Sequence, residues 1–241
     1  MALSEQLDAR ADGEVPPARV FLQPIAAPSV LGYFGLASGL IIFGTWLAGA
    51  WGSATSYTGF FQFVLLFAGF GQLAAALWSY RARDAVAASI HGAWGAFFTG
   101  FGIYWLVATL GTVPSPALGS MNQPVGQWFI YMAVITWTTA FAALARGVGL
   151  FVSHGVLGAG ALIAAVSFIT GAAGWQHGAG WVFVAAAALA IYQGTALMLN
   201  NLFGLTLLPR FTWRRDENLP GGHPVRPLEL TEGEPGVKAG Q

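Results

Sequence analysis

Cysteine is absent from the 241 residues, and charged residues are scarce. Without cysteine, the chain forms no disulfide bond and offers no thiolate nucleophile or thiolate metal ligand. Asp, Glu, Lys and Arg together make up 8% of the sequence, against about 25% in an average soluble domain. The formal net charge is zero, so the composition does not indicate a nucleic-acid partner. Hydrophobic residues make up 56%, and we therefore predict an integral membrane protein.

The residues needed for several kinds of enzyme are also missing. No carboxylate pair lies in the long apolar stretches, which excludes a hydrolase that uses two acids within the membrane. The sequence has no phosphate-binding loop and no zinc-protease helix motif. The apolar stretches contain two isolated histidines, too few to indicate a metal or haem redox centre. We expect no catalytic residue, no metal and no cofactor.

Long apolar runs are the dominant feature of the sequence. A bilayer is crossed by a helix of about 20 apolar residues, and six stretches approach or exceed this length. They are residues 30–50, 57–80, 85–110, 127–145, 149–171 and 179–203. The expected fold is an all-α membrane domain of six transmembrane helices, residues 27–210. A polar N-terminal arm (1–26) precedes it, and a Gly-, Pro- and Glu-rich tail (211–241), which we expect to be disordered, follows it.

The position of the charges predicts the orientation of these helices. The apolar stretches are uncharged, and the charges fall in the N-terminal arm, in the loop 81–84, at Arg146 and after Leu208. With six helices, all these places lie on one side of the membrane. Because loops rich in Lys and Arg stay in the cytoplasm, both termini are expected to be cytoplasmic.

Several short blocks match a known family over about residues 27 to 209, in order and spacing. Pro28, Leu31 and Gly32 match an Asn-Pro-Ala-Pro-Leu-Gly-Leu signature, with Ala27 at the asparagine position. Further blocks include a Gly-rich segment ending in glutamine, a Tyr-Lys pair and a Tyr-Gly-Ser-Phe block. The corresponding residues are, in this order, 68–72, 80–81 and 94–97. Toward the end of the chain, residues 190–192, 199–200 and 203–209 match best. In these blocks the chain resembles the acetate uptake transporter family, which contains bacterial succinate–acetate permeases and fungal acetate and ammonia-export proteins.

This resemblance implies a six-helix protomer that carries its own pore and assembles into a ring, usually a homohexamer. The expected location is the plasma membrane, here the bacterial inner membrane, in contact with lipid. The implied substrates are short monocarboxylates such as acetate, with succinate as a second candidate. The constriction residues of the family carry over to Leu36, Trp94 and Leu157, of which only Leu157 is unchanged. The chain departs from the family pattern at three further positions, which are Phe168, Leu197 and Asn201.

Two histidines lie within the predicted spans, and each precedes a constriction residue by three positions. His91 comes before Trp94, and His154 comes before Leu157. On a helix this spacing places the two side chains on one face, one turn apart. An unperturbed histidine titrates near pH 6.5, so both are candidates for a proton or carboxylate site beside the constriction. The alternative is a neutral histidine hydrogen-bonded between helices.

Gln72 is an uncharged polar residue in the middle of the second predicted span. Its amide hydrogens could be donated to a substrate carboxylate without burying a cation. The alternative is a hydrogen bond between helices. Backbone N–H groups at a helix start near Gly32 are a second expected source of donors.

The mechanism that we expect is proton-coupled or channel-like passage, because no carboxylate within the membrane is available to bind sodium. Two other functions fit the same sequence. The chain could be an accessory or structural subunit of a larger membrane complex, or a pore for ammonium, another small amine or water. Pore radius and oligomer geometry decide between such solutes.

Overall fold

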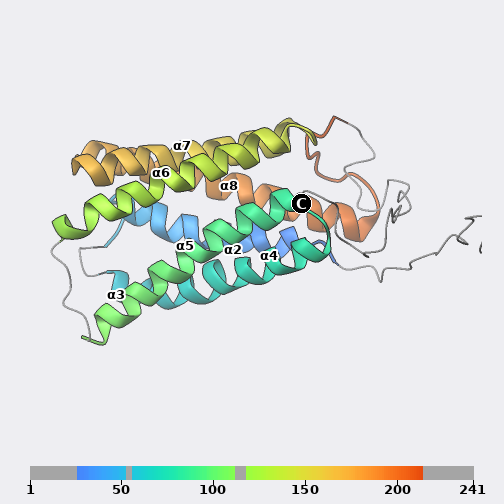
Figure 1. Ribbon diagram of the computed structural model, residues 1–241. Coiled ribbons are helices and arrows are strands. Elements are labelled where there is room, and N and C mark those ends of the chain that lie inside the picture. Colours follow the sequence, from blue (N-terminus) through green and yellow to red (C-terminus); the bar gives the residue numbers. More distant parts are fainter. Residues whose placement is uncertain (1–25, 53–55, 112–117, 214–241) are drawn as a thin grey trace, which may run out of the picture. The chain divides into compact units, whose positions relative to one another are not determined.

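The structure is a computed structural model that describes residues 26–52, 56–111 and 118–213. The expected N-terminal arm and nearly all of the expected tail lie outside these residues. The described part is helical, with one isolated backbone bridge between Gly147 and Thr212. Figure 1 shows the helices, which are α2 (Pro28–Leu47), α3 (Tyr57–Phe63), the π-helix η1 (Val64–Gly71), α4 (Gln72–Arg81), α5 (Ala85–Thr109), α6 (Leu118–Ala143), α7 (Val148–Thr170) and α8 (Ala173–Phe203).

Five helical segments are long and apolar enough to cross a membrane. They are Pro28–Leu47, Gly59–Arg81, Ala85–Thr109, Val148–Thr170 and Ala173–Phe203. The second of them joins α3, η1 and α4 into one rod. Helix α6 is also 26 residues long, but it contains Pro124 and is not among the five. The all-α membrane fold is confirmed, whereas the count of six spans stays a prediction.

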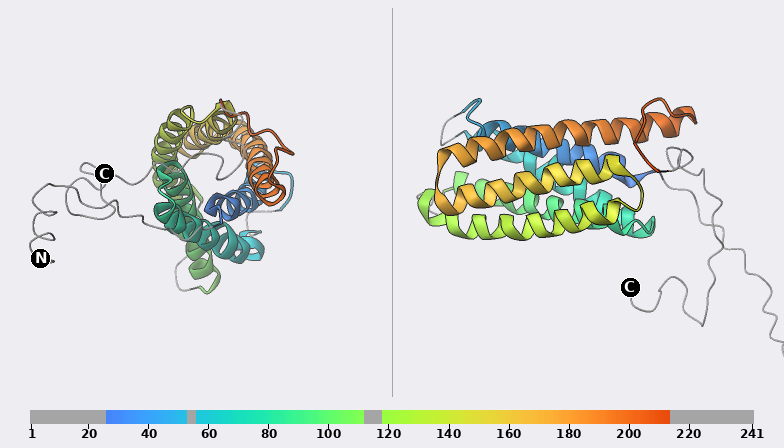
Figure 2. Two further views of the ribbon diagram at one scale, coloured as in Figure 1. Left: turned by 90° about the vertical axis from the view of Figure 1, so that its right-hand side faces the viewer. Right: turned by 90° about the horizontal axis from the view of Figure 1, so that it is seen from above.

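The long segments alternate in direction along the chain and surround a common interior when viewed along their axes (Figure 1, Figure 2). The connections at one end carry all the charged residues of the described part, which are Arg81, Arg83, Asp84, Arg146 and Arg210. We call this the charged end of the bundle and the other the uncharged end. The grouping of charges that we predicted from the sequence is therefore present, and the side of the membrane that it faces stays a prediction.

Two helix starts differ from the sequence prediction. Helix α6 begins at Leu118 and not at 127, because Pro124, which lies before the predicted span, is accommodated inside the helix. Helix α8 begins at Ala173 and not at 179. Its glycine-rich first turns favoured a loop, but Gly180 packs against the backbone of α2 at Gly44 and Ala48 with no room for a side chain. Packing between α2 and α8 outweighs the low helix propensity of glycine.

After α8 the chain turns back across the charged end. Gly204 ends α8 in the left-handed conformation, with φ of 64°, as glycine commonly does after a helix. Residues 204–213, which we call the strap, then run over the beginning of α7. Asn200 fixes this segment, because its side-chain oxygen accepts hydrogen bonds from the backbone N–H groups of Leu207 and Leu208 at 2.9 and 3.1 Å. The expected tail boundary at residue 211 falls within the strap.

Candidate functional site

Leu36, Trp94 and Leu157 are all buried in the hydrophobic core, with exposed fractions of 2%, 0% and 1%. Helices α2 and α5 run in the same direction and in register, since Gly32 packs on His91 and Gly39 packs on Phe98. Leu36 and Trp94, which lie between these two contacts, are therefore at the same depth in the bundle.

Contacts of helix α6 show that Leu157 lies at the same depth as Leu36 and Trp94. The indole N–H of Trp94 donates a buried hydrogen bond of 3.1 Å to the hydroxyl of Thr136 on α6. The next residue of α6, Trp137, packs on Gly158 of α7, beside Leu157. The three residues that we predicted for the constriction are thus at one level of the interior, which we call the Trp94 level.

His91 and His154 lie one helical turn from the Trp94 level toward the charged end. Both are fully or almost fully buried, with exposed fractions of 0% and 2%. The two ring nitrogens of His91 have no hydrogen-bond partner in the described part of the chain. Those of His154 make no hydrogen bond of good geometry either, although the backbone of Thr139 lies near its ring. A buried polar atom without a partner is rare and calls for an explanation.

The His91 ring is held by α2. The ring of Tyr33 meets it edge-on, with centroids 5.1 Å apart and an angle of 80° between the planes. Gly32 covers the His91 ring so closely that no side chain fits between them. Gly32 is one turn inside α2, which begins at Pro28, so the N–H groups that a helix start leaves without a partner inside the helix directly precede Gly32, and their role as donors stays a prediction.

Gln72 has a different environment from the one that we expected. Its backbone N–H bonds to the carbonyl of Gly69, and its side-chain amide donates to the carbonyl of Ala68 at 2.6 Å. The side chain thus satisfies an oxygen within its own helical rod, where η1 passes into α4. This bond uses one of the two hydrogens of the amide nitrogen, and no hydrogen bond from Gln72 to another helix is seen in the described part of the chain. The amide oxygen of Gln72 is buried and unpartnered, and the side chain is enclosed by Gly35 and Gly95.

Sequence reasoning missed a second buried glutamine, Gln193 of α8. Its side-chain amide donates to the hydroxyl of Ser153 at 3.4 Å, and its amide oxygen has no partner in the described part of the chain. Ser153 is the neighbour of His154 on α7. Gln193 therefore adds a polar side chain from a fourth helix at the depth of the histidines. The signal in the sequence was an uncharged polar residue within an otherwise apolar span, as at Gln72.

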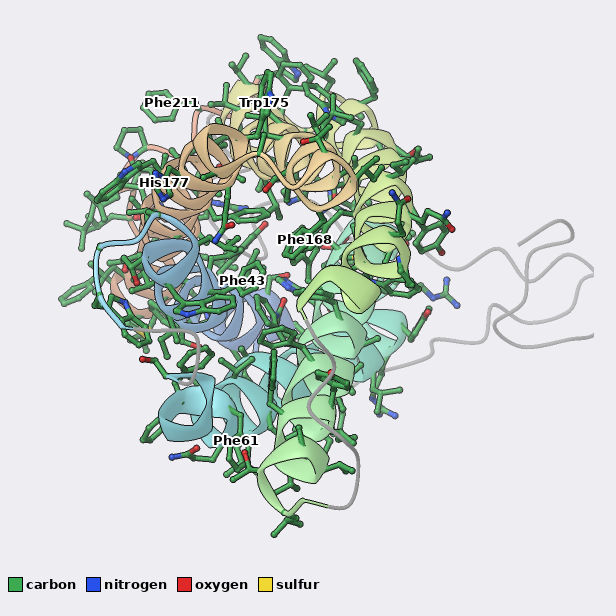
Figure 3. All side chains as sticks on the ribbon, turned by 90° about the vertical axis from the view of Figure 1, so that its left-hand side faces the viewer. Phe43, Phe61, Phe168, Trp175, His177 and Phe211 are labelled. Atoms are coloured by element: carbon green, nitrogen blue, oxygen red, sulfur yellow. The ribbon has the colours of Figure 1, made fainter. Side chains whose placement is uncertain are left out.

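On the uncharged side of the Trp94 level lies an aromatic cavity of about 410 Å³. Figure 3 shows Phe43 and Phe168 in the space enclosed by the helices, whereas Phe61 lies outside it. Phe129 stacks on both of the inner rings, with centroids 6.1 Å from Phe43 and 5.6 Å from Phe168. The lining consists of Phe43, Trp46, Ala96, Phe97, Gly100, Phe101, Tyr104, Trp105, Pro124, Val125, Trp128, Phe129 and Phe168. A cavity of this kind favours apolar or dehydrated solutes.

At the charged end, Asp84 and Arg146 form an ion pair. The guanidinium donates two hydrogen bonds to the carboxylate, of 2.7 and 3.0 Å. The carboxylate also caps α5 by accepting the N–H of Ala87 at 3.0 Å. Burial of the Asp84 carboxyl opposes its ionisation, but the hydrogen bonds and charge of Arg146 and the bond from Ala87 outweigh this and lower its pKa. Most of the positive charge of Arg146 is therefore balanced within the fold.

Comparison with known proteins identifies the family. Residues 12–212 match the sequence model of the GPR1/FUN34/yaaH family. The chain belongs to this family. The match covers the whole described part apart from its last residue, and it confirms the family that the sequence blocks indicated. No curated protein matches the chain in a sequence search.

A solved structure resembles this member of the GPR1/FUN34/yaaH family in its fold. It is the structure of the bacterial acetate channel SatP, with a TM-score of 0.70 and 24% sequence identity. The similarity covers 77% of this chain and 99% of SatP. Together with the five apolar helices of membrane length, it establishes a multi-pass membrane protein.

Proposed function

We propose that the chain is a membrane transporter or channel for small monocarboxylates such as acetate, with succinate as a further candidate substrate. Family membership and the fold shared with an acetate channel support this proposal. The observation that carries it in this chain is the pair His91 and His154, which are buried one turn below the apolar Trp94 level without good hydrogen-bond partners. No catalytic residue, metal or cofactor is part of the proposal.

The proposed pathway runs along the bundle interior and has three parts. The aromatic cavity receives the solute at the uncharged end, the Trp94 level forms the constriction, and the histidine layer lies beneath it. A bare carboxylate loses hydration worth several kcal/mol in such surroundings. A proton that travels with the substrate, on the acid itself or on a histidine, removes this cost. His91 and His154 are therefore the proposed proton-linked residues, and Gln72 is assigned a structural role.

The assembly and its setting are also proposed. Following the family resemblance, each protomer carries its own pathway in a homohexameric ring in the bacterial inner membrane. The charged end faces the cytoplasm together with both termini, in agreement with the positive-inside rule. The outer surfaces of the helices contact lipid or neighbouring protomers.

Uptake of labelled acetate into proteoliposomes that contain only this protein tests the proposal. We expect saturable uptake that an inward proton gradient enhances and that propionate and succinate inhibit. Uptake no faster than in empty liposomes, by protein shown to be folded and oligomeric, would contradict it. Labelled ammonium in the same vesicles and co-purification with other subunits test the two alternative functions.

Single substitutions test the histidines. His154→Gln and His91→Gln retain polarity and remove the titratable group. We expect each to reduce acetate uptake and to weaken its dependence on the proton gradient. His177, which lies at the beginning of α8 at the uncharged end (Figure 3), provides the control, and His177→Gln should leave both quantities unchanged. An unchanged gradient dependence in His154→Gln removes that residue from the mechanism.

A further inference from the structure

A second cavity, of about 420 Å³, lies between the strap and the helices α7 and α8 at the charged end. We call it the strap pocket. Its apolar walls include Val148 and Val152 of α7, Leu189 of α8, and Phe211 and Trp213 of the strap. The volume falls within the range of about 300–1,000 Å³ that is usual for ligand pockets in proteins.

The strap pocket opens on the outer surface of the bundle. Val148, Val152, Phe211 and Trp213 are all exposed, and Figure 3 shows Phe211 outside the space that the helices enclose. The pocket shares no lining residue with the aromatic cavity. A ligand therefore reaches it from the surroundings of the bundle and not through the proposed pathway.

Hydrogen bonds hold the strap over this pocket. The hydroxyl of Tyr192 donates to the carbonyl of Pro209 at 2.6 Å. The backbone N–H of Val148 donates to the carbonyl of Phe211 at 3.0 Å. The wall that the strap forms is thus ordered by bonds of its own, so little order is lost when a ligand binds.

The beginning of α7 is shaped to fit the strap. Gly147 and Gly149 pack against the backbone of the strap at positions where a side chain would collide. Phe211 has φ of 54°, which is unusual for a bulky residue. This conformation goes together with the Phe211 carbonyl that caps α7, where a helix start leaves N–H groups unpaired. The pocket is therefore built into the fold.

A buried glutamine lies at the inner end of the strap pocket. Among the described residues that line the pocket, only Ser153 and Gln193 are buried. The amide nitrogen of Gln193 donates one hydrogen to the hydroxyl of Ser153 at 3.4 Å, and the amide oxygen has no partner in the described part of the chain. The hydroxyl of Ser153 donates its own hydrogen to the carbonyl of Gly149 at 2.8 Å. The inner end thus presents one unpartnered acceptor beside the second hydrogen of an amide nitrogen.

The rest of the lining restricts the chemistry of a ligand. None of the described residues that line the strap pocket is charged. A carboxylate or ammonium ion buried here would lose hydration without compensation. A ligand that suits the pocket therefore has a neutral head that donates a hydrogen bond to Gln193, and an apolar remainder that fits the walls.

We propose that the strap pocket binds an undissociated monocarboxylic acid with an apolar chain of medium length. The acid O–H donates to the amide oxygen of Gln193, and the acid carbonyl accepts the second hydrogen of the amide nitrogen. A carboxylic acid and a primary amide complement each other in this way, because each offers one donor beside one acceptor. The apolar chain lies against Val152, Leu189 and Phe211. The site is separate from the proposed pathway and does not depend on acetate transport.

Two other occupants suit the pocket less well. The acyl chain of a phospholipid ends in a methyl group and has no donor for Gln193. A neighbouring copy of the chain presents a broad surface, whereas the amide lies at the inner end of a pocket, where a slender group reaches it. Both occupants would leave the amide oxygen of Gln193 unpartnered, which is rare for a buried polar atom.

Binding of labelled octanoic acid to the purified full chain tests the site. The measurement is made in detergent at mildly acidic pH, and binding to empty micelles is subtracted. We expect saturable binding for which octanamide, with a donor and an acceptor, competes. Methyl octanoate has the same chain without a donor and should compete about tenfold more weakly. Absence of saturable binding, or equal competition by the ester, overturns the site.

The length of the acid tests the apolar walls. Affinity should rise about fourfold for each CH₂ group added from butyric to octanoic acid, because each buried CH₂ group contributes a similar increment. A further rise to hexadecanoic acid supports the site with a fatty acid of the membrane as its ligand. A maximum at a shorter chain supports it with a water-soluble acid. An affinity that does not depend on chain length overturns the site.

Two substitutions test the residues of the pocket. Gln193→Met keeps the size of the side chain but removes the amide, and it should weaken octanoic acid binding at least about tenfold. Gln72→Met makes the same change at a buried glutamine outside the pocket and should leave binding unchanged. Val152→Trp fills the pocket from its exposed wall and should abolish binding. Leu162→Trp, on the outer surface of the same helix, should not.

Melting temperature and oligomeric state show whether each variant is folded. If Gln193→Met does not fold, Val152→Trp decides, because Val152 is exposed and its replacement leaves the core intact. Equal affinity in Gln193→Met and Gln72→Met overturns the site, and so does unchanged binding by folded Val152→Trp.

Quenching of tryptophan fluorescence locates the bound acid. The indole N–H of Trp213 donates to the carbonyl of Leu144 at 2.5 Å, which holds the ring at the wall of the strap pocket. A brominated octanoic acid should quench this ring on contact, so saturable quenching should be smaller in Trp213→Phe than in the unsubstituted chain. Trp175→Phe, which removes an exposed ring at the uncharged end, should keep the full effect. Equal quenching in Trp213→Phe and the unsubstituted chain places the acid elsewhere and overturns the site.

Discussion

Gly32 of α2 lies directly against the imidazole of His91 on α5, and a Cβ atom at residue 32 would collide with three atoms of the ring. Gly32 is one of the residues that match the sequence signature of the family. Its position gives a physical reason for a glycine there, because the small residue allows a buried histidine to lie flat against α2. The position of His91 thus depends on a residue of another helix.

Gly32→Ala is expected to displace the His91 ring, because the new methyl group cannot fit beside it. Overpacking of this kind costs about 1–3 kcal/mol, so the melting temperature in detergent should fall. Acetate uptake should fall further than the loss of folded protein explains. The matched control is Gly92→Ala, next to His91, where an added Cβ meets only Ala76 at 3.7 Å. If Gly32→Ala and Gly92→Ala have the same acetate uptake, the contact between Gly32 and His91 does not affect transport.

Gln72→Met is expected to lower stability and to leave the KM for acetate unchanged. The substitution removes the donor to the Ala68 carbonyl and also removes the unpartnered amide oxygen, so the net cost is limited to about 1 kcal/mol. Thermal unfolding in detergent and uptake kinetics measure the two quantities. Gln62→Met provides a control on the same rod, since Gln62 also donates to a backbone carbonyl, that of Gly59. A raised KM in Gln72→Met, with Gln62→Met unaffected, would restore Gln72 to the substrate pathway.

The pair of Asp84 and Arg146 is expected to make stability depend on pH in the acidic range. The pKa of Asp84 is lower in the folded chain than its ordinary value, which is about 3.9. The stabilisation is therefore present above pH of about 4 and is lost as the pH falls through the lowered pKa. Because Arg146 is 45% exposed, the pair contributes at most about 1 kcal/mol. Melting temperatures between neutral and acidic pH measure this contribution.

Two substitutions at residue 84 separate the ion pair from the helix cap. Asp84→Asn keeps a side chain that can cap α5 and removes the charge, so this part of the acid dependence should disappear. Asp84→Ala also removes the cap and should be less stable than Asp84→Asn by about 1 kcal/mol. An acid dependence that is the same in Asp84→Asn as in the unsubstituted chain would assign it to other groups.

Local patterns in the sequence predicted the helices and several buried positions. The spacing of three residues between His91 and Trp94, and between His154 and Leu157, was enough to place each pair on one face, and all four side chains are buried. The uncharged spans and the clustered arginines predicted the membrane fold and the charged end. These features depend on helical periodicity and on the cost of charge in lipid, which are properties of the sequence itself.

Contacts between distant residues could not be predicted in the same way. Gln193 joins Ser153, which is 40 positions away, and Phe211 accepts the N–H of Val148 only because the strap turns back across the charged end. The predicted start of α8 was wrong. Glycines weaken a helix locally, but here they allow α8 to pack closely against α2. The hydrogen bond of Gln72 within its own rod was not predicted, because it depends on the change from η1 to α4, and no periodic pattern indicates such a change.

Leu157→Ala is expected to relax selectivity for the size of the acid. Leu157 is 1% exposed and lies at the Trp94 level, so its truncation widens the interior there. The substitution also costs about 2–5 kcal/mol of stability, and Trp94→Phe therefore serves as a milder second variant, which keeps a ring but loses the bond to Thr136. The ratio of butyrate to acetate uptake measures the effect, because it does not depend on the amount of folded protein.

The control for this prediction lies on the same helix. Leu162 is 52% exposed, and Leu162→Ala makes the same chemical change on the outer surface of α7. We expect the ratio of butyrate to acetate uptake to rise in Leu157→Ala, to rise less in Trp94→Phe and to stay constant in Leu162→Ala. If Leu157→Ala and Leu162→Ala have the same ratio, the Trp94 level does not limit the size of the solute. The constriction must then lie at another depth, and the aromatic cavity around Phe43 and Phe168 is the next position to test.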